Sequence, residues 1–476
     1  MVHEYTLKIQ NDYSWLITSD GKIKRKLFEK LRVRERGYFH SALYKQNIWD
    51  GYIEFFKEDG GRFLTGLLPE VLAALREENI KVKIHETREF FPWLHTNIDE
   101  NFLNQFVPKS MKEFSLYDYQ VDSINCVLRN YRGIVKFPTG GGKTAIMIGI
   151  LKALQPKTPV LFLTKGASLV EQNYAEMKEW GIENVGRIYG KYKEPNFITC
   201  ATTSKMTLEK LEPILPKFKV LIVDEVHDCM SPVPRKAYKK MHNAVARIGI
   251  SATPYKHGGK DFTQKMYLRG FFGGILKTST TESGVVTTKD LQAREILSSS
   301  NCTFYPIKHP QIPHEPYIDA VTLGIAENYY FAQQVQKLVG KLHGRTLVLV
   351  DRIKQGELLS QLIPNSYWIK GPTDLTERSK VFQQLKYGDN AVAIVMQQIV
   401  SAGINVFIHN LVNAAGGKAQ HSIIQRFGRG LRTAEDKETL QYYDFIFDIN
   451  TYLYKHSLLR MKTLQTEGHN VKIEIL

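Results

Sequence analysis

The sequence has few cysteines and no long hydrophobic run. Its four cysteines, Cys126, Cys200, Cys229 and Cys302, lie far apart and form no CxxC pair, so they predict neither a zinc site nor a disulfide framework. Buried free thiols in a reducing compartment are the simpler interpretation. No segment approaches the roughly 18 consecutive apolar residues that span a bilayer, and the N-terminus lacks the apolar run of a signal peptide. We therefore expect a cytoplasmic protein with no membrane partner.

Acidic residues are in the minority. The chain has 64 Lys and Arg residues against 48 Asp and Glu residues, which gives a formal net charge of +16. A chain this basic attracts polyanions without sequence preference, because its cations release counterions from phosphates. Charge alone does not distinguish a nucleic-acid-binding protein from a basic protein without such a partner.

The first 105 residues differ in pattern from the rest. They contain short alternating runs (EYTLKIQ, SWLIT and GYIEFF), a helical segment from Leu67 to Glu78, and the strand-like KVKIHE. This pattern predicts a small α+β domain over residues 1–105. Basic residues cluster early in this domain: Lys22, Lys24, Arg25, Lys26, Lys30, Arg32, Arg34 and Arg36.

Apolar strands alternate with helical segments from about residue 106 onwards. The first series of expected strands comprises Gly133–Phe137, Val160–Leu163, Phe197–Cys200, Val220–Val223 and Ile248–Ser251. The second series comprises Thr346–Val350, Ser366–Ile369, Ala391–Val395 and Tyr443–Asp448. Such runs predict an α/β fold with two parallel sheets, each covered by helices on both faces. Four prolines within residues 305–316 predict a stiff connector, so we expect lobes at 106–304 and 318–476 joined by a linker at 305–317.

A glycine-rich loop lies between an apolar strand and an apolar helix. RGIVKF continues into PTGGGKT and then AIMIGILKAL, which is the order that a phosphate-binding loop requires. Glycines let backbone N–H groups turn towards phosphates, a lysine reaches the β- and γ-phosphates, and a threonine hydroxyl binds Mg²⁺. Phe137 departs from the usual pattern, which has Gly or Ala there. The expected ligands are ATP and Mg²⁺, and the candidate residues are Pro138, Thr139, Gly140, Gly141, Gly142, Lys143 and Thr144.

A second expected strand ends in two carboxylates. VLIVDEVHD occupies residues 220–228, about 80 residues after the glycine-rich loop. At the end of this strand, Asp224 would hold Mg²⁺ through water and Glu225 would act as general base for the attacking water. His227 completes the sequence DEVH. A solvated loop is the alternative interpretation of this strand end, but its position after a phosphate-binding loop favours the catalytic one.

Several further stretches resemble motifs of superfamily 2 helicases, and they occur in that family's order. LYDYQ resembles the Q-motif that reads adenine; Tyr117 replaces the usual Arg, so only Gln120 is carried over. LFLTKGASLVEQ resembles motif Ia, CATTSKM resembles motif Ib or Ic, and Ser251-Ala252-Thr253 resembles motif III. The resemblance implies contacts to the DNA backbone at Thr164, Lys165, Thr202 and Thr203, and coupling roles for His227, Ser251 and Thr253.

The second half of the chain continues the series. TLVLVDRIKQGELL resembles motif IV, SAGINV motif V and QRFGRGLR motif VI. The resemblance, over about residues 114–450, implies two RecA-like lobes, nucleotide sensing at Gly403 and Gln425, and arginine fingers at Arg429 and Arg432. Guanidinium groups suit this role because the transition state of phosphoryl transfer spreads negative charge over several oxygens. A helix-surface ion pair is the alternative interpretation of the two arginines.

The N-terminal stretch NIWDGYIEFF, with the helix and KVKI after it, resembles phage UvsW-type recombination helicases, and a T5-like phage helicase is a close candidate. This resemblance implies an N-terminal domain that engages branched DNA. Within it, Trp49 is either a stacking platform for a base or a core residue, and we favour the core. The basic cluster is a better DNA candidate, although such a run is more often a solvated face.

The leading hypothesis is an ATP-dependent DNA helicase or translocase acting on branched DNA, such as forks and Holliday junctions, in recombination, repair or replication. The alternatives are an RNA helicase, a duplex-DNA translocase motor without unwinding, and a non-catalytic nucleic-acid-binding protein. The last would explain the net charge but not Lys143, Glu225 and Arg432 in helicase order. The oligomeric state is open, a monomer being compatible with the sequence, and a phage-encoded chain would act in the host cytoplasm.

Overall fold

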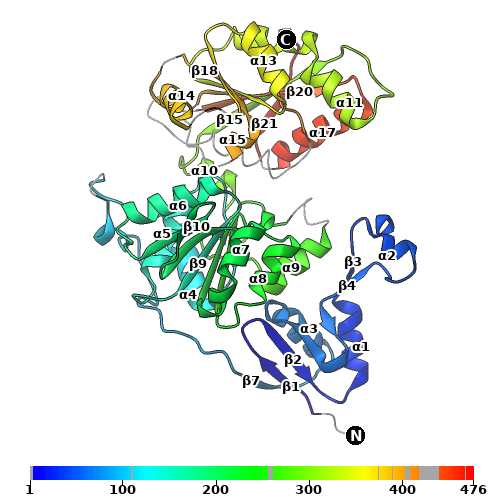
Figure 1. Cartoon of the computed structure of the whole chain (residues 1–476), viewed down its shortest axis with the longest axis vertical. Coiled ribbons are helices and arrows are strands. Elements are labelled where there is room, and N and C mark those ends of the chain that lie inside the picture. The colour runs from blue at the N-terminus through cyan, green and yellow to red at the C-terminus, as the bar shows by residue number, and fades with distance from the viewer. Residues whose placement is uncertain are drawn as a thin grey trace. The chain divides into compact units, whose positions relative to one another are not determined.

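The computed structural model contains two compact units, Met1–Phe137 with Gly142–Val286 and Pro138–Gly141 with Thr287–Leu476. Each unit has its own seven-stranded sheet, and the first also has a five-stranded N-terminal sheet (Figure 1). The α/β fold class with two RecA-like lobes is confirmed. The structure describes residues 4–108, 111–255, 261–371, 373, 375–388, 390–401, 408–417, 439–466 and 468–476.

The N-terminal sheet has the strand order β5-β6-β2-β1-β7. Its strands are β1 (Thr6–Ile9), β2 (Tyr13–Ile17), β5 (Phe56–Lys57), β6 (Arg62–Leu64) and β7 (Lys83–Glu86), and its helices are α1 (Gly21–Lys30) and α3 (Leu68–Glu77). The carboxylate of Asp20 caps α1 by accepting from the backbone N–H groups of Lys22 and Ile23. A separate pair, β3 (Arg32–Arg34) and β4 (Tyr52–Glu54), is connected through the short helix α2 (Ala42–Lys45). The predicted α+β character is thus confirmed, and the boundary at residue 105 stays a prediction.

The sheet of the first RecA-like lobe has the order β11-β10-β12-β9-β13-β14-β8. All its neighbours are parallel except β10 and β11. The strands are β8 (Arg132–Lys136), β9 (Val160–Thr164), β10 (Val185–Tyr189), β11 (Tyr192–Glu194), β12 (Ile198–Thr202), β13 (Val220–Asp224) and β14 (Ala246–Ser251). The helices include α4 (Asp118–Asn130), α5 (Lys143–Lys152), α6 (Ala167–Glu179), α7 (Lys205–Leu211), α8 (Pro232–Tyr238) and α9 (Phe262–Phe272). All five predicted strands are present, and the sequence pattern missed β10 and β11.

The sheet of the second lobe is parallel, with the order β17-β18-β16-β19-β20-β15-β21. Its strands are β15 (Ser299–Ile307), β16 (Thr346–Val350), β17 (Ser366–Ile369), β18 (Val392–Met396), β19 (Asn410–Asn413), β20 (Thr439–Phe447) and β21 (Asn470–Ile473). The helices include α10 (Thr288–Ala293), α11 (Tyr317–Val321), α12 (Tyr329–Val339), α13 (Ile353–Leu362), α14 (Leu375–Tyr387), α15 (Gln397–Ser401) and α17 (Thr451–Thr466). The four predicted strands correspond to β16, β17, β18 and β20.

The predicted linker differs from the structure. Tyr305–Ile307 belongs to β15, a strand inside the second sheet, and the second unit already includes Thr287. Pro306 is tolerated there because β21 pairs with β15 only from Asn301 to Phe304, so the missing N–H of this proline removes no bond on that side. The other three prolines of the segment lie between β15 and α11.

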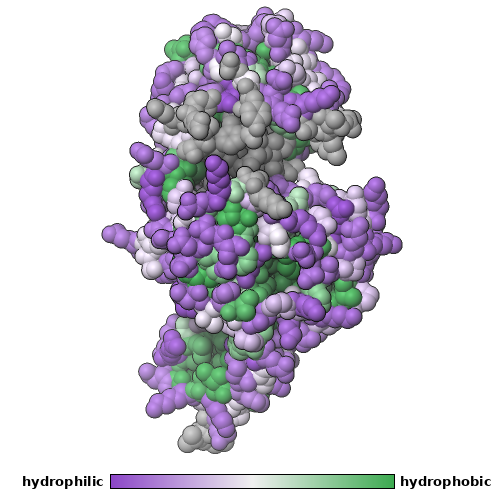
Figure 2. All heavy atoms as spheres, turned by 90° about the vertical axis from the view of Figure 1, so that its left-hand side faces the viewer, coloured by the Kyte–Doolittle hydropathy of each residue, from purple (hydrophilic) through white to green (hydrophobic). Residues whose placement is uncertain are grey.

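The cysteines, the helix lengths and the polarity of the surface can be compared with the sequence in the described part of the structure. All four cysteines are free and buried, as predicted. Across the described ranges, every helix is too short or too polar to traverse a lipid bilayer. Hydrophilic residues predominate on the face shown in Figure 2, with smaller apolar areas between them.

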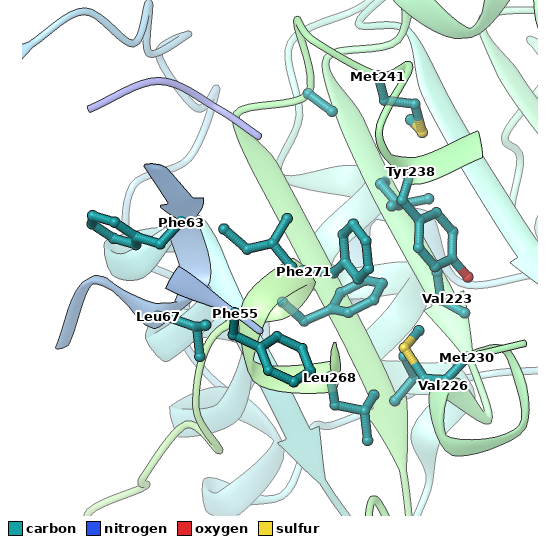
Figure 3. Packing of buried hydrophobic residues seen from close by; sticks show 14 of the residues in the cluster. Phe55, Phe63, Leu67, Val223, Val226, Met230, Tyr238, Met241, Leu268 and Phe271 are labelled. Carbon is teal, nitrogen blue, oxygen red and sulfur yellow. The ribbon is translucent and has the colours of Figure 1, made fainter. Parts of the chain in front are cut away.

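The N-terminal sheet and the first lobe share one hydrophobic core. Figure 3 shows Leu268 and Phe271 of α9 between Phe55 and Leu67 of the N-terminal region on one side and Val226 of the lobe on the other. All five side chains are at most 5% exposed. Burial of this much apolar surface on both sides of α9 joins the two parts into one folding unit.

Replacement of Gly66 tests this packing. A Cβ at Gly66 would lie 2.0 Å from the carbonyl oxygen of Arg269 on α9, so we expect Gly66→Ala to destabilise the first unit by about 1–3 kcal/mol. Urea unfolding monitored by tryptophan fluorescence measures this change. Gly21→Ala is the matched control, because nothing lies within 4 Å of its Cβ position. Equal stability of the two variants would contradict the close approach of η3 (Thr65–Leu67) to α9.

Candidate nucleotide-binding site

The glycine-rich loop joins β8 to α5 with backbone angles that favour glycine. Gly140 and Gly142 have φ values of 88° and 92°, in the left-handed region that side chains disfavour. At Gly142 space is restricted too, because a Cβ would lie 2.2 Å from Nε2 of Gln120. Gly142 is the N-cap of α5 and makes no side-chain cap bond. The residues thus fit a phosphate group, which backbone N–H groups at a helix N-terminus bind.

Lys143 and Glu225 form an ion pair. Lys143 is the first residue of α5, and its Nζ donates to Oε1 of Glu225 at 2.8 Å. Their side chains are 18% and 21% exposed, so both groups remain accessible to a ligand. Glu225 directly follows β13 and has a φ of 45°, an uncommon conformation for a residue with a side chain. This turn places the two carboxylates predicted from DEVH at the carboxyl end of the sheet, next to the lysine of the loop.

Asp224 has an electrostatic environment suited to a cation. Burial and the adjacent charge of Glu225 raise the pKa of Asp224 to about 6, against the opposing effect of Lys143. A nearby divalent cation favours the ionised form of such a carboxylate. The hydroxyl of Thr144 and the carboxylate of Asp224 are the hard oxygen ligands that Mg²⁺ prefers. Among the described residues there is no cluster of three or more His, Cys, Asp or Glu side chains able to hold a metal.

The DEVH turn is hydrogen-bonded to the serine of the SAT sequence. His227 is fully buried, and its Nδ1 lies 2.7 Å from Oγ of Ser251. The same hydroxyl donates to Oε2 of Glu225 at 3.4 Å and accepts from the backbone N–H of Thr253 at 3.1 Å. The neighbouring strands β13 and β14 bring these residues together. The structure therefore gathers the three predicted coupling residues around the candidate general base.

The four residues assigned to the DNA backbone lie at the same edge of the sheet but differ in exposure. Thr164 ends β9, and its carbonyl accepts from the N–H of Thr203 at 3.0 Å. The side chains of Thr164 and Thr202 are buried, and Oγ1 of Thr202 bonds to Thr207 at 2.8 Å. Lys165 is 63% exposed and pairs with Asp228 at 3.0 Å. Burial thus argues against direct phosphate contacts by the side chains of Thr164 and Thr202, and leaves Lys165 as the exposed cation of the set.

The Q-motif region adds an aromatic side chain that sequence reasoning did not assign to the site. Gln120 is 3% exposed, and its Oε1 accepts from the N–H of Tyr117 at 3.0 Å. Tyr117 is 45% exposed and stacks on Tyr119, with ring centroids 5.3 Å apart. An exposed ring next to this glutamine is suited to stacking on a base. The tyrosine in place of the usual arginine was the signal in the sequence.

A second missed residue is Gln264 of α9. Its Nε2 donates to the carbonyl of Pro254 at 3.1 Å and lies 3.5 Å from the carbonyl of His227. No helicase motif that we recognised in the sequence includes this glutamine, so the pattern gave no signal for it. The remaining predicted residues, Gly403, Gln425, Arg429 and Arg432, lie outside the described residues.

Half of the basic cluster in the N-terminal domain is engaged in ion pairs. Ion pairs with glutamates involve Arg25, Lys26, Lys30 and Arg32. Half of the predicted cluster is therefore neutralised, as on a solvated helix face. The interpretation of Trp49 as a core residue is wrong, because Trp49 is half-buried and lines an open pocket of about 750 Å³ with Phe39 and Tyr44.

The raised pKa of Asp224 predicts a pH dependence of stability. The folded pKa of about 6 exceeds the unfolded value of about 3.9, so between these values the folded state binds more protons and stability falls as pH rises. Asp224→Asn cannot ionise, and we expect the variant to lose less stability between about pH 4 and pH 6. Urea unfolding with a chelator present measures both proteins, with the exposed Asp59→Asn as control. Parallel pH profiles for the parent chain and Asp224→Asn would rule out this burial effect.

Comparison with known proteins links this geometry to a family. The family model described as "Type III restriction enzyme, res subunit" (ResIII) matches residues 113–256, which include the glycine-rich loop, DEVH and SAT. The crystallised fragment of a putative HsdR subunit of a type I restriction enzyme from Vibrio vulnificus YJ016 aligns with 89% of this chain and 78% of that chain, with a TM-score of 0.57 and 15% identity. This likeness concerns the fold. The crystal structure of T4 UvsW aligns with 100% of this chain and 99% of that chain, with a TM-score of 0.49 and 18% identity.

Curated relatives include helicases from viruses and archaea. "Putative helicase 22" of Sulfolobus islandicus filamentous virus is 22% identical over 77% of this chain and 70% of its own length. "Probable helicase D10" of Escherichia phage T5 is 24% identical over 64% of this chain and 70% of its own length. "Putative DNA 3'-5' helicase Rad25" of Haloarcula marismortui is 24% identical over 67% of this chain, which spans 51% of that relative. With the motifs in helicase order and the site geometry, these matches show that the chain is similar to superfamily 2 helicases, those of phages among them.

Proposed function

We propose that the chain is an ATP-dependent DNA helicase or translocase that acts on branched DNA. The observation that carries this proposal is the contact between Lys143 and Glu225 at 2.8 Å, beside the buried bond between His227 and Ser251. A nucleotide-binding lysine, a candidate general base and a coupling serine thus lie in one hydrogen-bonded site. DNA rather than RNA is supported by the names of relatives such as the Haloarcula Rad25 helicase.

In the proposed mechanism, Lys143 exchanges its partner Glu225 for the phosphates of ATP before hydrolysis. When ATP binds, the ammonium group of Lys143 moves from the carboxylate of Glu225 to the β- and γ-phosphates, and Glu225 becomes free to accept a proton. The attacking water forms a bond to the γ-phosphorus and transfers its proton to Glu225, while the bond between this phosphorus and the leaving oxygen of ADP breaks. Mg²⁺, held by Thr144 and Asp224, would supply charge neutralisation at the phosphates. Arg429 and Arg432 are proposed to add positive charge from the second half of the chain.

The N-terminal domain is proposed to engage the DNA through its β3–β4 extension, residues 32–54. Phe39 is 53% exposed there, and the guanidinium of Arg34 lies 4.3 Å from the centre of the Tyr38 ring. Aromatic surfaces beside arginines suit unpaired bases and their backbone phosphates. The half-buried Trp49 at the same pocket supports this assignment over the paired cations of α1.

Loss of ATP turnover tests the catalytic assignments. We expect Lys143→Ala and Glu225→Gln to lower kcat for DNA-stimulated ATP hydrolysis at least about 100-fold, because each removes a group that acts on the transferred phosphoryl group or its nucleophile. A phosphate-release assay measures the rates, and thermal melting verifies folding. Lys472→Ala, at a lysine 54% exposed on β21, is the control and should retain the parent rate. Equal turnover in Glu225→Gln and the parent would exclude Glu225 as general base.

The substrate is tested by comparing nucleic acids of different structure. We expect ATPase stimulation and strand displacement to be greater with fork and Holliday-junction DNA than with linear duplex DNA or RNA of the same length. The physical reason is that a branch presents both duplex and unpaired bases to the motor and the β3–β4 extension at once. Preference for linear RNA would instead support the RNA-helicase alternative. Stimulation by linear duplex DNA without strand displacement would support a translocase that does not unwind.

A further inference from the structure

Helix α9 begins at the hydrogen-bonded site of the first lobe. Asp261 caps the helix by accepting from the N–H of Gln264 at 2.9 Å. The side chain of Gln264 is 8% exposed, and its Nε2 donates to the carbonyl of Pro254 and approaches the carbonyl of His227, at 3.1 and 3.5 Å. One amide group therefore bridges the turn after β13 to the turn after β14. Because the amide is buried, its loss would leave these carbonyls without this donor.

The other end of α9 contacts the N-terminal domain. The ring of Tyr267 meets that of Phe55 edge-on, with centroids 4.8 Å apart, and Arg269 forms an ion pair with Glu70. Gly270 allows a still closer approach, because a Cβ there would lie 2.6 Å from Cδ1 of Leu64. Such packing leaves little room for the two surfaces to slide over one another.

A single helix of 11 residues thus spans the distance from the DEVH turn to the N-terminal sheet. Its intrahelical hydrogen bonds make it stiff on the scale of one domain. Val226 of the DEVH turn also shares the hydrophobic core with Phe55, Leu67 and Leu268 (Figure 3). A shift of the DEVH turn that accompanies nucleotide binding would therefore move α9, and α9 would move the N-terminal sheet with it.

We propose that α9 couples the nucleotide site to the N-terminal domain, with Gln264 as the positioning residue at the nucleotide end. One consequence rests on the proposed function: nucleic acid that is bound by the N-terminal domain changes the rate of ATP hydrolysis through α9. The coupling is reciprocal for binding, since a nucleotide that alters the N-terminal domain must itself be bound differently when nucleic acid occupies that domain. A purely structural role for Gln264 would lower stability without altering the response to nucleic acid.

The first test uses the full chain and three variants. Gln264→Met keeps the side-chain length and removes the donor, and Gly270→Ala perturbs the opposite end of the helix. Gln292→Met is the matched control, because Gln292 donates Nε2 to the carbonyl of Ser298 at 2.9 Å in the second unit. We expect the ratio of fork-stimulated to unstimulated kcat to fall about tenfold in Gln264→Met, the equivalent of one buried hydrogen bond. The KM for ATP should change less than about twofold, and Gly270→Ala should lower the same ratio with its unstimulated rate retained.

The second test does not depend on nucleic acid. Hydrogen exchange of the backbone amides from Arg62 to Leu68 is measured with and without the slowly hydrolysed analogue AMP-PNP and Mg²⁺. We expect the analogue to slow exchange in the parent chain and in Gln292→Met but not in Gln264→Met. If no nucleic acid stimulates ATP hydrolysis by the parent chain, the proposed function is refuted. The exchange data would still decide whether α9 couples the nucleotide site to the N-terminal domain. A folded Gln264→Met variant with the parent's stimulation ratio and exchange response would overturn the inference.

Discussion

The ion pair between Lys143 and Glu225 is the interaction on which the candidate site depends. Two adjacent carboxylates, Asp224 and Glu225, lie at the end of a buried strand, where desolvation and the charge of Glu225 disfavour the ionised form of Asp224. Lys143 supplies the compensating charge from a different part of the sequence. Lys143 follows β8 and Glu225 follows β13, and β14 lies between these two strands in the sheet. The ion pair therefore joins segments that are not neighbours in the sheet. Under the proposed function, a phosphate would compete for this lysine, so that binding of the ligand would release the carboxylate of Glu225.

The topology of the sheet explains why the proximity of Lys143 and Glu225 could be predicted from the sequence. Parallel strands end at one edge of their sheet, so residues directly after β8, β9, β12, β13 and β14 must gather there. The buried strands could be recognised in the sequence as continuous apolar runs because both faces of the sheet are covered. β10 was missed because Gly186 and Arg187 interrupt its apolar pattern, and β15 was mistaken in part for a linker because Pro306 lies within it. The residue pattern within a strand does not indicate which other strands will be its neighbours in the sheet.

Side-chain exposure was the least predictable property of the site. Thr164 and Thr202 stand where the motifs require them, yet their hydroxyl groups are turned into the protein. The cations of α1 lie close together in the sequence, and three of them pair with glutamates outside this helix: Glu58, Glu77 and Glu78. Both outcomes depend on long-range packing, which spacing along the chain does not encode. Trp49 illustrates the converse, since an apolar ring expected in a core instead lines an open pocket.

The junction between the N-terminal domain and the first lobe has a mechanical consequence. Gly66 brings its backbone against the carbonyl of Arg269, and Gly270 brings α9 against Leu64. The contact at Gly66 is between backbones, and such a contact cannot relax by changing a rotamer, as contacts between long side chains can. Under the proposed function, a force on nucleic acid bound by the N-terminal domain would therefore be carried into the lobe through α9 rather than absorbed at the junction. The domain is consequently better described as an extension of the first lobe than as a tethered accessory, and the glycines at the junction contribute to its stiffness.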